Sequence, residues 1–188
     1  MDDFNWIKTS QNARLVSEEE RNKLESQLLI DESKKRKFEV EAQKNWDRFY
    51  KRNTDKQFKD RNWTKRDLQE ILDEVDFNTS LVFLEAGCGV GNTLLPMKSF
   101  FPHWTICGFD FSKNAIQILD EKTKELNLQV QSAVIDLTSS DVENLQTTVR
   151  FPLADIISLI FVLSSISPEK QALVVKNLKY YLKPGEVL

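Results

Sequence analysis

The chain has 188 residues, of which 40% are hydrophobic, and a net charge of −3. This length is enough for one domain with a sizeable core. The longest apolar run, residues 156–163, is far shorter than the roughly 20 residues that a bilayer span needs. The first three residues, Met1-Asp2-Asp3, lack the basic start of a signal or transit peptide. We therefore expect a protein of the cytoplasm, with the nucleus as a second location.

Cysteine and histidine are too scarce for metal chemistry. The chain has two cysteines without CxxC spacing and one histidine. A four-ligand zinc site or a disulfide framework needs more of these residues at closer spacing. We expect no metal cofactor.

The positive charge is confined to one segment. Residues 34–66 hold 13 Lys and Arg against 5 Asp and Glu, whereas the rest of the chain holds 13 against 24. The segment is therefore strongly basic although the whole chain is acidic. Such a segment can attract phosphate groups whatever the total charge is.

The first part of the sequence predicts helices joined by polar turns. Neither glycine nor proline occurs before Gly87, and Ser17 with Glu20 has the form of a capping box that starts a helix. A second cap is predicted at Thr64 with Asp67. The spacing of Trp46, Phe49 and Tyr50 puts three rings on one helical face.

From residue 81 onwards, short apolar runs alternate with helical patterns. Strands are predicted over residues 81–85, 105–109, 130–135 and 153–162, and helices over 91–100, 112–126 and 168–182. This alternation indicates βαβ units and a parallel sheet, hence an α/β fold. We divide the chain into a helical segment, residues 1–76, and an α/β domain, residues 77–188. Because the sequence stops where a fifth strand is expected to begin, we expect the strand over 153–162 to lack a neighbour on its far side.

A glycine loop lies between the first predicted strand and the helix that follows it. Gly87, Gly89 and Gly91 follow Glu85 in the pattern acidic-x-Gly-x-Gly-x-Gly. Glycine permits a tight turn and a close approach of the backbone to a ligand. Dinucleotide folds favour GxGxxG, but Asn92 stands where their third glycine is sought. The loop therefore indicates a nucleotide-like cofactor other than a dinucleotide.

Two acidic residues end the next two strands. Asp110 follows the second strand, where a carboxylate can accept hydrogen bonds from ribose hydroxyls. Asp136 with Leu137 follows the third, where an acid can meet an adenine amino group and an apolar side chain can cover the ring. Since ligands bind at the carboxyl ends of strands in α/β folds, these residues narrow the prediction to S-adenosylmethionine.

This arrangement resembles the Rossmann-like class I methyltransferase superfamily. Five segments resemble more closely the methyltransferase-like family that forms 3-methylcytidine in the anticodon loop of tRNA. They are AQKNWDRFYKRN from Ala42, FKDRNWT from Phe58, LEAGCGVGN from Leu84, DFS from Asp110 and LIFVLS from Leu159. The resemblance implies an S-adenosylmethionine-dependent tRNA methyltransferase. Some relatives use an aminoacyl-tRNA synthetase, such as the seryl enzyme, as a helper.

The resemblance also implies which residues bind the cofactor and the RNA. The implied cofactor residues are Trp46, Tyr50, Gly87, Gly89, Asp110, Asp136, Leu137 and Ile160. The predicted RNA-binding residues are Lys44, Arg48, Lys51, Arg52, Lys59, Arg61, Lys65 and Arg66. Aromatic rings between these cations can stack unpaired bases while the cations hold phosphates. No catalytic residue is assigned, because cytosine N3 already carries a lone pair and needs no general base.

Other interpretations stay open. Trp46 and Tyr50 taken alone fit core aromatics, and the basic residues fit a solvated helix face. A methyltransferase for protein or a small molecule would share the glycine loop but would not need the basic aromatic segment. A non-catalytic or regulatory form fits the expected loss of C-terminal strands, which would also leave cofactor binding and methyl transfer weak. A dehydrogenase fits worst, because the glycine spacing is wrong for it.

Overall fold

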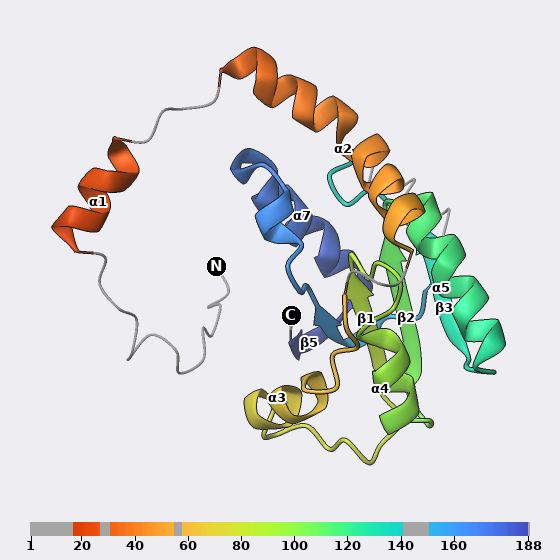
Figure 1. The fold of residues 1–188 in the computed structure, drawn as a ribbon. Coiled ribbons are helices and arrows are strands. Elements are labelled where there is room, and N and C mark those ends of the chain that lie inside the picture. The colour runs from red at the N-terminus through yellow and green to blue at the C-terminus, as the bar shows by residue number, and fades with distance from the viewer. Residues whose placement is uncertain (1–16, 27–30, 55–57, 141–150, 188) are drawn as a thin grey trace. The chain divides into compact units, whose positions relative to one another are not determined.

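The computed structural model describes residues 17–26, 31–54, 58–140 and 151–187 (Figure 1). The chain forms two compact units, Met1–Phe38 and Glu39–Leu188. The second unit contains all the strands. The sequence predicts a border near residue 76, but by packing the second unit already begins at Glu39.

The first helix, α1 (Glu18–Glu25), starts at the predicted capping box. The Ser17 hydroxyl accepts a hydrogen bond from the Glu20 amide at 3.2 Å, and the Glu20 carboxylate accepts one from the Ser17 amide at 3.0 Å. Two amide donors that the helix leaves unpaired are thus satisfied. The predicted helix start is confirmed.

The remaining elements alternate as the sequence predicts. The helices are α2 (Glu32–Asn53), α3 (Thr64–Ile71), α4 (Leu94–Phe100), α5 (Lys113–Glu125) and α7 (Pro168–Leu178), with the short 3-10 helices η2 (Leu163–Ser165) and η3 (Lys179–Tyr181). The strands are β1 (Val82–Ala86), β2 (Thr105–Asp110), β3 (Val130–Val134), β4 (Ala154–Ser158) and β5 (Leu182–Val187). Within the described ranges, no helix is both long and apolar enough to cross a membrane.

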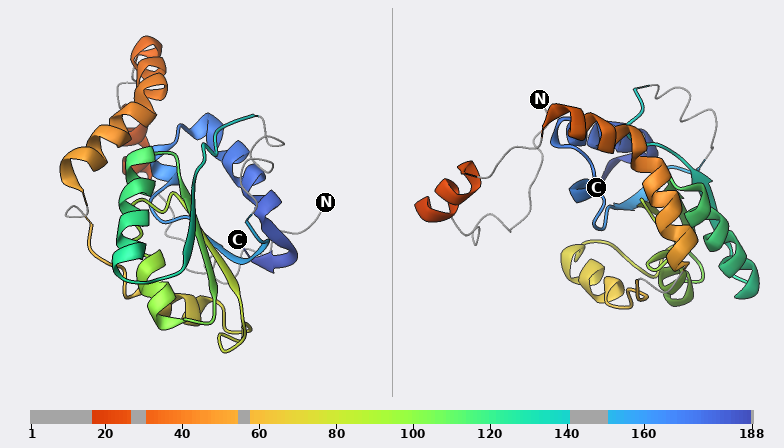
Figure 2. Two further views of the ribbon diagram at one scale, coloured as in Figure 1. Left: turned by 90° about the vertical axis from the view of Figure 1, so that its right-hand side faces the viewer. Right: turned by 45° about the horizontal axis from the view of Figure 1, so that its top comes forward.

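The five strands form one parallel sheet in the order β3-β2-β1-β4-β5. The order reverses at β1, because β2 and β3 lie on one side of it and β4 and β5 on the other. In the view at the left of Figure 2, α4 and α5 lie on one face of the sheet and α7 on the opposite face. The predicted α/β fold with a parallel sheet is confirmed.

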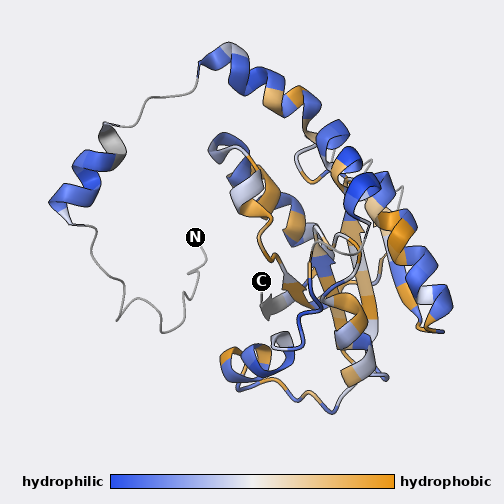
Figure 3. Ribbon diagram, viewed as in Figure 1, coloured by the Kyte–Doolittle hydropathy of each residue, from blue (hydrophilic) through white to orange (hydrophobic). Residues whose placement is uncertain are grey.

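Both faces of the sheet are buried, as expected for parallel strands covered by helices. On one face, Phe83 and Ile106 pack with Leu94 and Met97 of α4 and Leu119 of α5. On the other, neighbouring strand residues, among them Leu84 and Cys107, pack with Val174 and Leu178 of α7. Figure 3 shows the resulting hydrophobic colour along the central strands. The sheet therefore provides a rigid base for the loops at its edges.

The expectation that β4 lacks a far-side neighbour is wrong. β5 pairs with it in parallel, from Ala154 beside Leu182 to Ile156 beside Val187, and the Lys183 ammonium lies 2.6 Å from the Asp155 carboxylate. The sequence predicts a helix up to residue 182, yet α7 ends at Leu178. Pro184 is compatible with β5 because this is an edge strand, where a missing amide donor is tolerated.

Two further local predictions are wrong. β4 ends at Ser158 rather than at residue 162, because its pairing with β1 ends where Glu85 lies beside Ser158 and β1 itself stops one residue later. The apolar residues beyond Ser158 form a loop instead. Thr64 does not cap α3: Trp63 occupies the N-cap, and the Thr64 hydroxyl is buried without a hydrogen-bond partner among the described residues.

The buried indole of Trp104 provides a test of the core. Its ring stacks on that of Phe101 at 4.1 Å between centroids, and its Nε1 donates to the Phe77 carbonyl at 3.3 Å. Replacing a large buried ring by alanine removes these contacts and leaves a cavity. We expect Trp104→Ala to lower the free energy of unfolding by about 3–5 kcal/mol in urea titrations.

The matched control is Trp63→Ala, because Trp63 is 45% exposed. That change should cost less than about 1 kcal/mol. Equal losses in the two variants would contradict the packing described for Trp104.

Candidate functional site

The residues that the sequence singles out come together at one edge of the sheet. Because all strands are parallel, the carboxyl ends of β1, β2, β3 and β4 lie at the same edge of the sheet (Figure 1). Asp110 is the last residue of β2, whereas Gly87, Asp136 and Ile160 come shortly after β1, β3 and β4. The strand order also reverses at β1. Open α/β sheets bind their ligands at such a switch point.

The glycine loop adopts a backbone that other residues rarely adopt. Gly87, Gly89 and Gly91 have φ values of +69°, +54° and +85°. The amides of Gly87 and Cys88 both donate to the Phe109 carbonyl, at 2.8 and 3.0 Å, which holds the loop to the end of β2. A Cβ added at Gly87 would lie 2.3 Å from Val162 Cγ2. Glycine is therefore required by both conformation and space.

The Asp110 carboxylate holds the loop and the start of α5. One oxygen accepts from the Gly89 amide and the other from the Ser112 amide, each at 2.9 Å. The side chain is almost completely buried, and this burial raises the pKa of the carboxyl above its ordinary value. Each oxygen has a further lone pair. Asp110 can therefore accept ligand hydroxyls while it keeps the loop in place.

Asp47 fastens α2 to the same point. Its carboxylate accepts from the Ser112 hydroxyl at 2.6 Å and from the Asn114 amide at 3.3 Å, and its backbone carbonyl accepts from the Asn114 side chain at 2.8 Å. A carboxylate at the first turn of a helix is favourable, because the free amides and the helix dipole carry positive charge there. This contact positions the aromatic residues of α2 on either side of Asp47.

Three aromatic rings of α2 pack together, which confirms the predicted aromatic face. The Trp46 and Tyr50 rings stack at 5.9 Å between centroids, and Phe49 meets both edge-on. Tyr50 is buried, and its hydroxyl lies 2.7 Å from the place that a Cβ of Gly89 would occupy. Burial raises the Tyr50 pKa, so the hydroxyl stays protonated. Tyr50 thus lies directly on the glycine loop.

Asn92 joins the loop to the segment between α2 and α3. Its side-chain amide donates to the Phe58 carbonyl and to the Asp60 carboxylate, each at 3.1 Å, and its carbonyl accepts from the Arg61 amide at 2.7 Å. The residue that breaks the dinucleotide pattern therefore has a structural role. It anchors residues 58–61 beside the glycine loop.

The buried acidic side chain of Glu85 lies beside the partly buried basic side chain of Arg61. Glu85 is fully buried at the end of β1, and the Arg61 guanidinium lies 3.7 Å from its carboxylate. The carboxylate oxygens make no hydrogen bond within the described part of the chain, whereas Arg61 donates to the Thr93 hydroxyl at 3.2 Å. Burial raises the pKa of Glu85 to about 8, although the Arg61 charge opposes the shift.

The other predicted cofactor residues lie at the same edge. Asp136 is exposed, and its carboxylate accepts from the amide and hydroxyl of Thr138 at 2.8 and 2.7 Å. Leu137 is buried, and Ile160 is half-buried after β4. The structure brings together the strand ends that carry these residues, while their role in cofactor binding stays a prediction.

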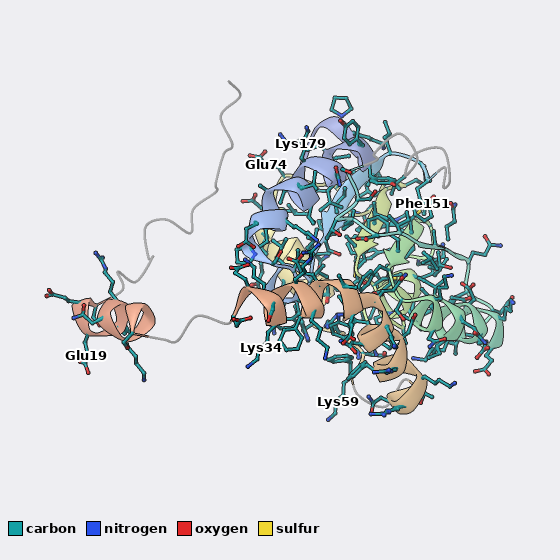
Figure 4. All side chains as sticks on the ribbon, turned by 90° about the horizontal axis from the view of Figure 1, so that it is seen from above. Glu19, Lys34, Lys59, Glu74, Phe151 and Lys179 are labelled. Carbon is teal, nitrogen blue, oxygen red and sulfur yellow. The ribbon has the colours of Figure 1, made fainter. Side chains whose placement is uncertain are left out.

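The predicted RNA-binding residues differ in their surroundings. Six of them are exposed: Lys44, Arg48, Lys51, Arg52, Lys59 and Arg66, and Lys59 points outward in Figure 4. Arg61 is turned towards Glu85. The Lys65 ammonium lies 5.2 Å from the Phe100 ring centre, and the exposed Arg66 pairs with Asp67 at 3.0 Å. The accessible part of the predicted RNA surface is therefore formed by these six exposed cations.

Sequence reasoning did not single out Asp47, and it did not foresee that Asn92 joins the loop to residues 58–61. It also did not single out Phe161, whose side chain is exposed after β4. The departure of Asn92 from the glycine pattern was a usable signal. Asp47 had none, because its partner lies 65 residues away. Among the described residues, no group of three histidine, cysteine or acidic side chains is arranged to hold a metal ion.

A family model described as a methyltransferase domain matches residues 84–188. This match covers more than half of the chain, including the glycine loop and both acidic strand ends. The chain belongs to the methyltransferase domain family. Curated relatives extend the similarity into the N-terminal segment.

The human tRNA N(3)-cytidine methyltransferase METTL6 is 41% identical over 176 residues, which are 93% of this chain and 61% of the human protein. The tRNA N(3)-methylcytidine methyltransferase trm141 of Schizosaccharomyces pombe is 37% identical over 149 residues, 79% of this chain and 58% of that protein. The chain thus spans about three fifths of the length of these curated relatives.

Solved structures support the fold. PKMT2 from Rickettsia typhi superposes with a TM-score of 0.56 at 19% identity, covering 69% of this chain and 25% of that chain. Magnesium protoporphyrin IX methyltransferase from Synechocystis PCC 6803 gives 0.54 at 16% identity, covering 77% and 66%. These similarities concern the fold alone.

The raised pKa of Glu85 predicts a pH dependence of stability. The folded chain binds this proton more tightly than the unfolded chain, so the stabilisation is complete below the ordinary pKa of 4.5 and is lost as pH rises towards 8. Glu85→Gln removes the titration. Relative to this variant, the wild type should lose up to about 1.4 kcal/mol of unfolding free energy per pH unit in between.

Urea titrations from pH 5 to 8 measure this difference. Glu74→Gln is the control, because Glu74 is exposed and should show no such trend. Parallel stability curves for the wild type and Glu85→Gln would contradict the buried, protonated carboxyl.

Proposed function

We propose that this chain carries the cofactor-binding part of an S-adenosylmethionine-dependent methyltransferase that forms 3-methylcytidine in the anticodon loop of tRNA. The names of the curated relatives and the family membership support this proposal. The observation that carries it is the attachment of the basic, aromatic residues of α2 and of residues 58–61 to the loops at the carboxyl ends of β1 and β2. Asp47 of α2 accepts from Ser112 at the start of α5, and Asn92, directly after the glycine loop, donates to Phe58.

The residues at the strand ends fit the cofactor. The loop backbone lies close to the Val162 and Tyr50 side chains because Gly87 and Gly89 lack a Cβ. Asp110 offers lone pairs to the ribose hydroxyls beyond those that its amide partners use. Asp136 and Leu137 would hold the adenine, while Trp46 and Tyr50 would cover the cofactor from α2. S-adenosylmethionine, when bound, supplies an electrophilic methyl group on a positively charged sulfur.

Methyl transfer to cytosine N3 does not require a general acid or base from the protein. Cytosine N3 donates its lone pair to the methyl carbon as the bond from carbon to sulfur breaks, and that bonding pair stays on sulfur. The positive charge moves to the cytosine ring, and no proton leaves. The protein must hold the two reactants in line and present an unpaired base.

The exposed cations of residues 44–59 would bind the tRNA backbone. Each phosphate contact releases a counterion, so binding weakens steeply as the salt concentration rises. This surface distinguishes the proposal from a methyltransferase for a small molecule, which has no need of it. An aminoacyl-tRNA synthetase such as the seryl enzyme stays a predicted helper, and the cytoplasm, with the nucleus as a second location, stays the predicted place of action.

The test incubates the full-length protein with S-adenosylmethionine and unmodified tRNA, with and without seryl-tRNA synthetase, and identifies the modified nucleosides by mass spectrometry. We expect 3-methylcytidine at an anticodon-loop position. Methylation of another nucleoside or of protein alone, or no product in either arm, would overturn the proposal.

Asp110→Asn tests the cofactor site. The change replaces one acceptor oxygen by an amide nitrogen, and the loss of such a hydrogen bond costs about 1.5–3 kcal/mol, so we expect roughly 10- to 100-fold weaker binding of S-adenosylmethionine in calorimetry. Asp120→Asn is the matched control, since Asp120 on α5 hydrogen-bonds Ser132 of β3 rather than the loop. Equal affinity in the two variants would show that Asp110 does not hold the cofactor.

A further inference from the structure

Phe161 is the most unusual residue at the carboxyl edge of the sheet. Its side chain is 78% exposed, and its backbone has φ of +60°, a conformation that is strained for a bulky residue. Such strain persists only where neighbours enforce it, and strained residues cluster at functional sites. An exposed apolar ring on a strained backbone therefore indicates that the ring binds another molecule.

The neighbours of Phe161 hold the strained turn in place. The Val162 side chain fills the space that Gly87 leaves open, and the Val162 carbonyl accepts from the Ser165 amide at 2.9 Å and from the Ser165 hydroxyl at 2.7 Å. Phe161 is thereby fixed beside the glycine loop. The ring therefore belongs to the carboxyl edge of the sheet, where the predicted cofactor residues lie.

A second observation comes from the N-terminal segment. The Arg61 guanidinium lies 5.6 Å from the centre of the Phe161 ring; it donates to the Thr93 hydroxyl at 3.2 Å and lies 3.7 Å from the Glu85 side chain. The ring is thus oriented from one side by a fixed cation while most of its surface stays accessible. This arrangement suits a flat, aromatic ligand that stacks on the ring.

We propose that Phe161 is the platform on which the target cytosine stacks, an inference that rests on the proposed function. Proteins recognise unpaired RNA bases by stacking them on aromatic side chains. The reaction also makes the base cationic, and the negative face of an aromatic ring stabilises a cation close to it. Phe161 therefore favours both the entry of the base and the charge that develops on it.

The experiment compares Phe161→Leu, which removes the aromatic face, with Phe161→Tyr, which keeps it, in the full-length protein. Tyr180→Leu is the matched control, because Tyr180 is also an exposed aromatic residue, with 43% of its surface accessible. Tyr180 precedes β5, and the first residue of β5 pairs with the first residue of β4. Tyr180 therefore lies at the amino ends of these strands, opposite to the candidate site. The measurements are kcat/KM for 3-methylcytidine formation, the Kd for S-adenosylmethionine and the midpoint of thermal unfolding.

We expect Phe161→Leu to lower kcat/KM by about 10-fold or more, as the loss of one stacked base predicts. Phe161→Tyr and Tyr180→Leu should stay within about 3-fold of the wild type, and all variants should keep the cofactor Kd and the unfolding midpoint. A fluorescent cytosine analogue at the methylated position of the tRNA should be quenched by the wild type and by Phe161→Tyr but not by Phe161→Leu.

Wild-type kcat/KM and quenching in Phe161→Leu would overturn the stacking role and leave the proposed function intact. A large fall in the unfolding midpoint of Phe161→Leu would also overturn it, because the ring would then be a packing residue in the full-length protein. A wild type that makes no 3-methylcytidine would overturn both proposals.

Discussion

The two hydrogen bonds accepted by the Asp110 carboxylate hold the candidate site together. One fixes Gly89 in the glycine loop and the other fixes Ser112 at the start of α5. Because the Ser112 hydroxyl in turn donates to Asp47, α2 and its aromatic rings depend on the same carboxylate. A single buried acid at the end of β2 thus links the glycine loop, α5 and, through Ser112, the part of α2 around Asp47.

This position explains why the burial of a charged group is tolerated. An isolated carboxylate in a low-dielectric interior is costly, and burial indeed raises the pKa of Asp110. Two amide donors offset part of that cost and still leave lone pairs for a ligand. Glu85 is buried on the neighbouring strand β1 without backbone amide donors, and burial raises its pKa to about 8 although the Thr93 hydroxyl and the Arg61 charge oppose the shift. Burial thus raises the pKa of both acids, and the two differ in the hydrogen bonds that oppose this shift.

The sequence predicted the parts of the fold that depend on local patterns. Strand β2, helix α5 and the loop from Gly87 to Gly91 follow from periodicity and from glycine spacing, and they lie where expected. β4 was predicted too long because the apolar residues after Ser158 form a loop, in which Leu159 and Leu163 pack against the core and Phe161 is exposed. β5 was missed because Pro184 and Gly185 in a short segment signal a turn, whereas an edge strand accepts both.

The site was predicted less completely, for a physical reason. Asp110 was identified because the end of a parallel strand is a place that sequence can locate. Asp47 and Asn92 act through partners that pattern analysis cannot pair with them, since those partners lie on other elements. The exposed ring of Phe161 was hidden in an apolar run that looked like the continuation of a strand. Hydrophobic pattern alone does not distinguish a buried side chain from one held at a loop.

The contacts that fasten the N-terminal segment have a consequence for folding order. Asp47 meets Ser112 across 65 residues, and Asn92 meets Phe58 across 34, whereas helix hydrogen bonds span four. Long-range contacts form late, because the chain entropy lost in closing such loops must first be compensated by the core. The binding edge is therefore completed after the helices, at a stage that it shares with the pairing of β1 and β4, in which Phe83 lies beside Ile156.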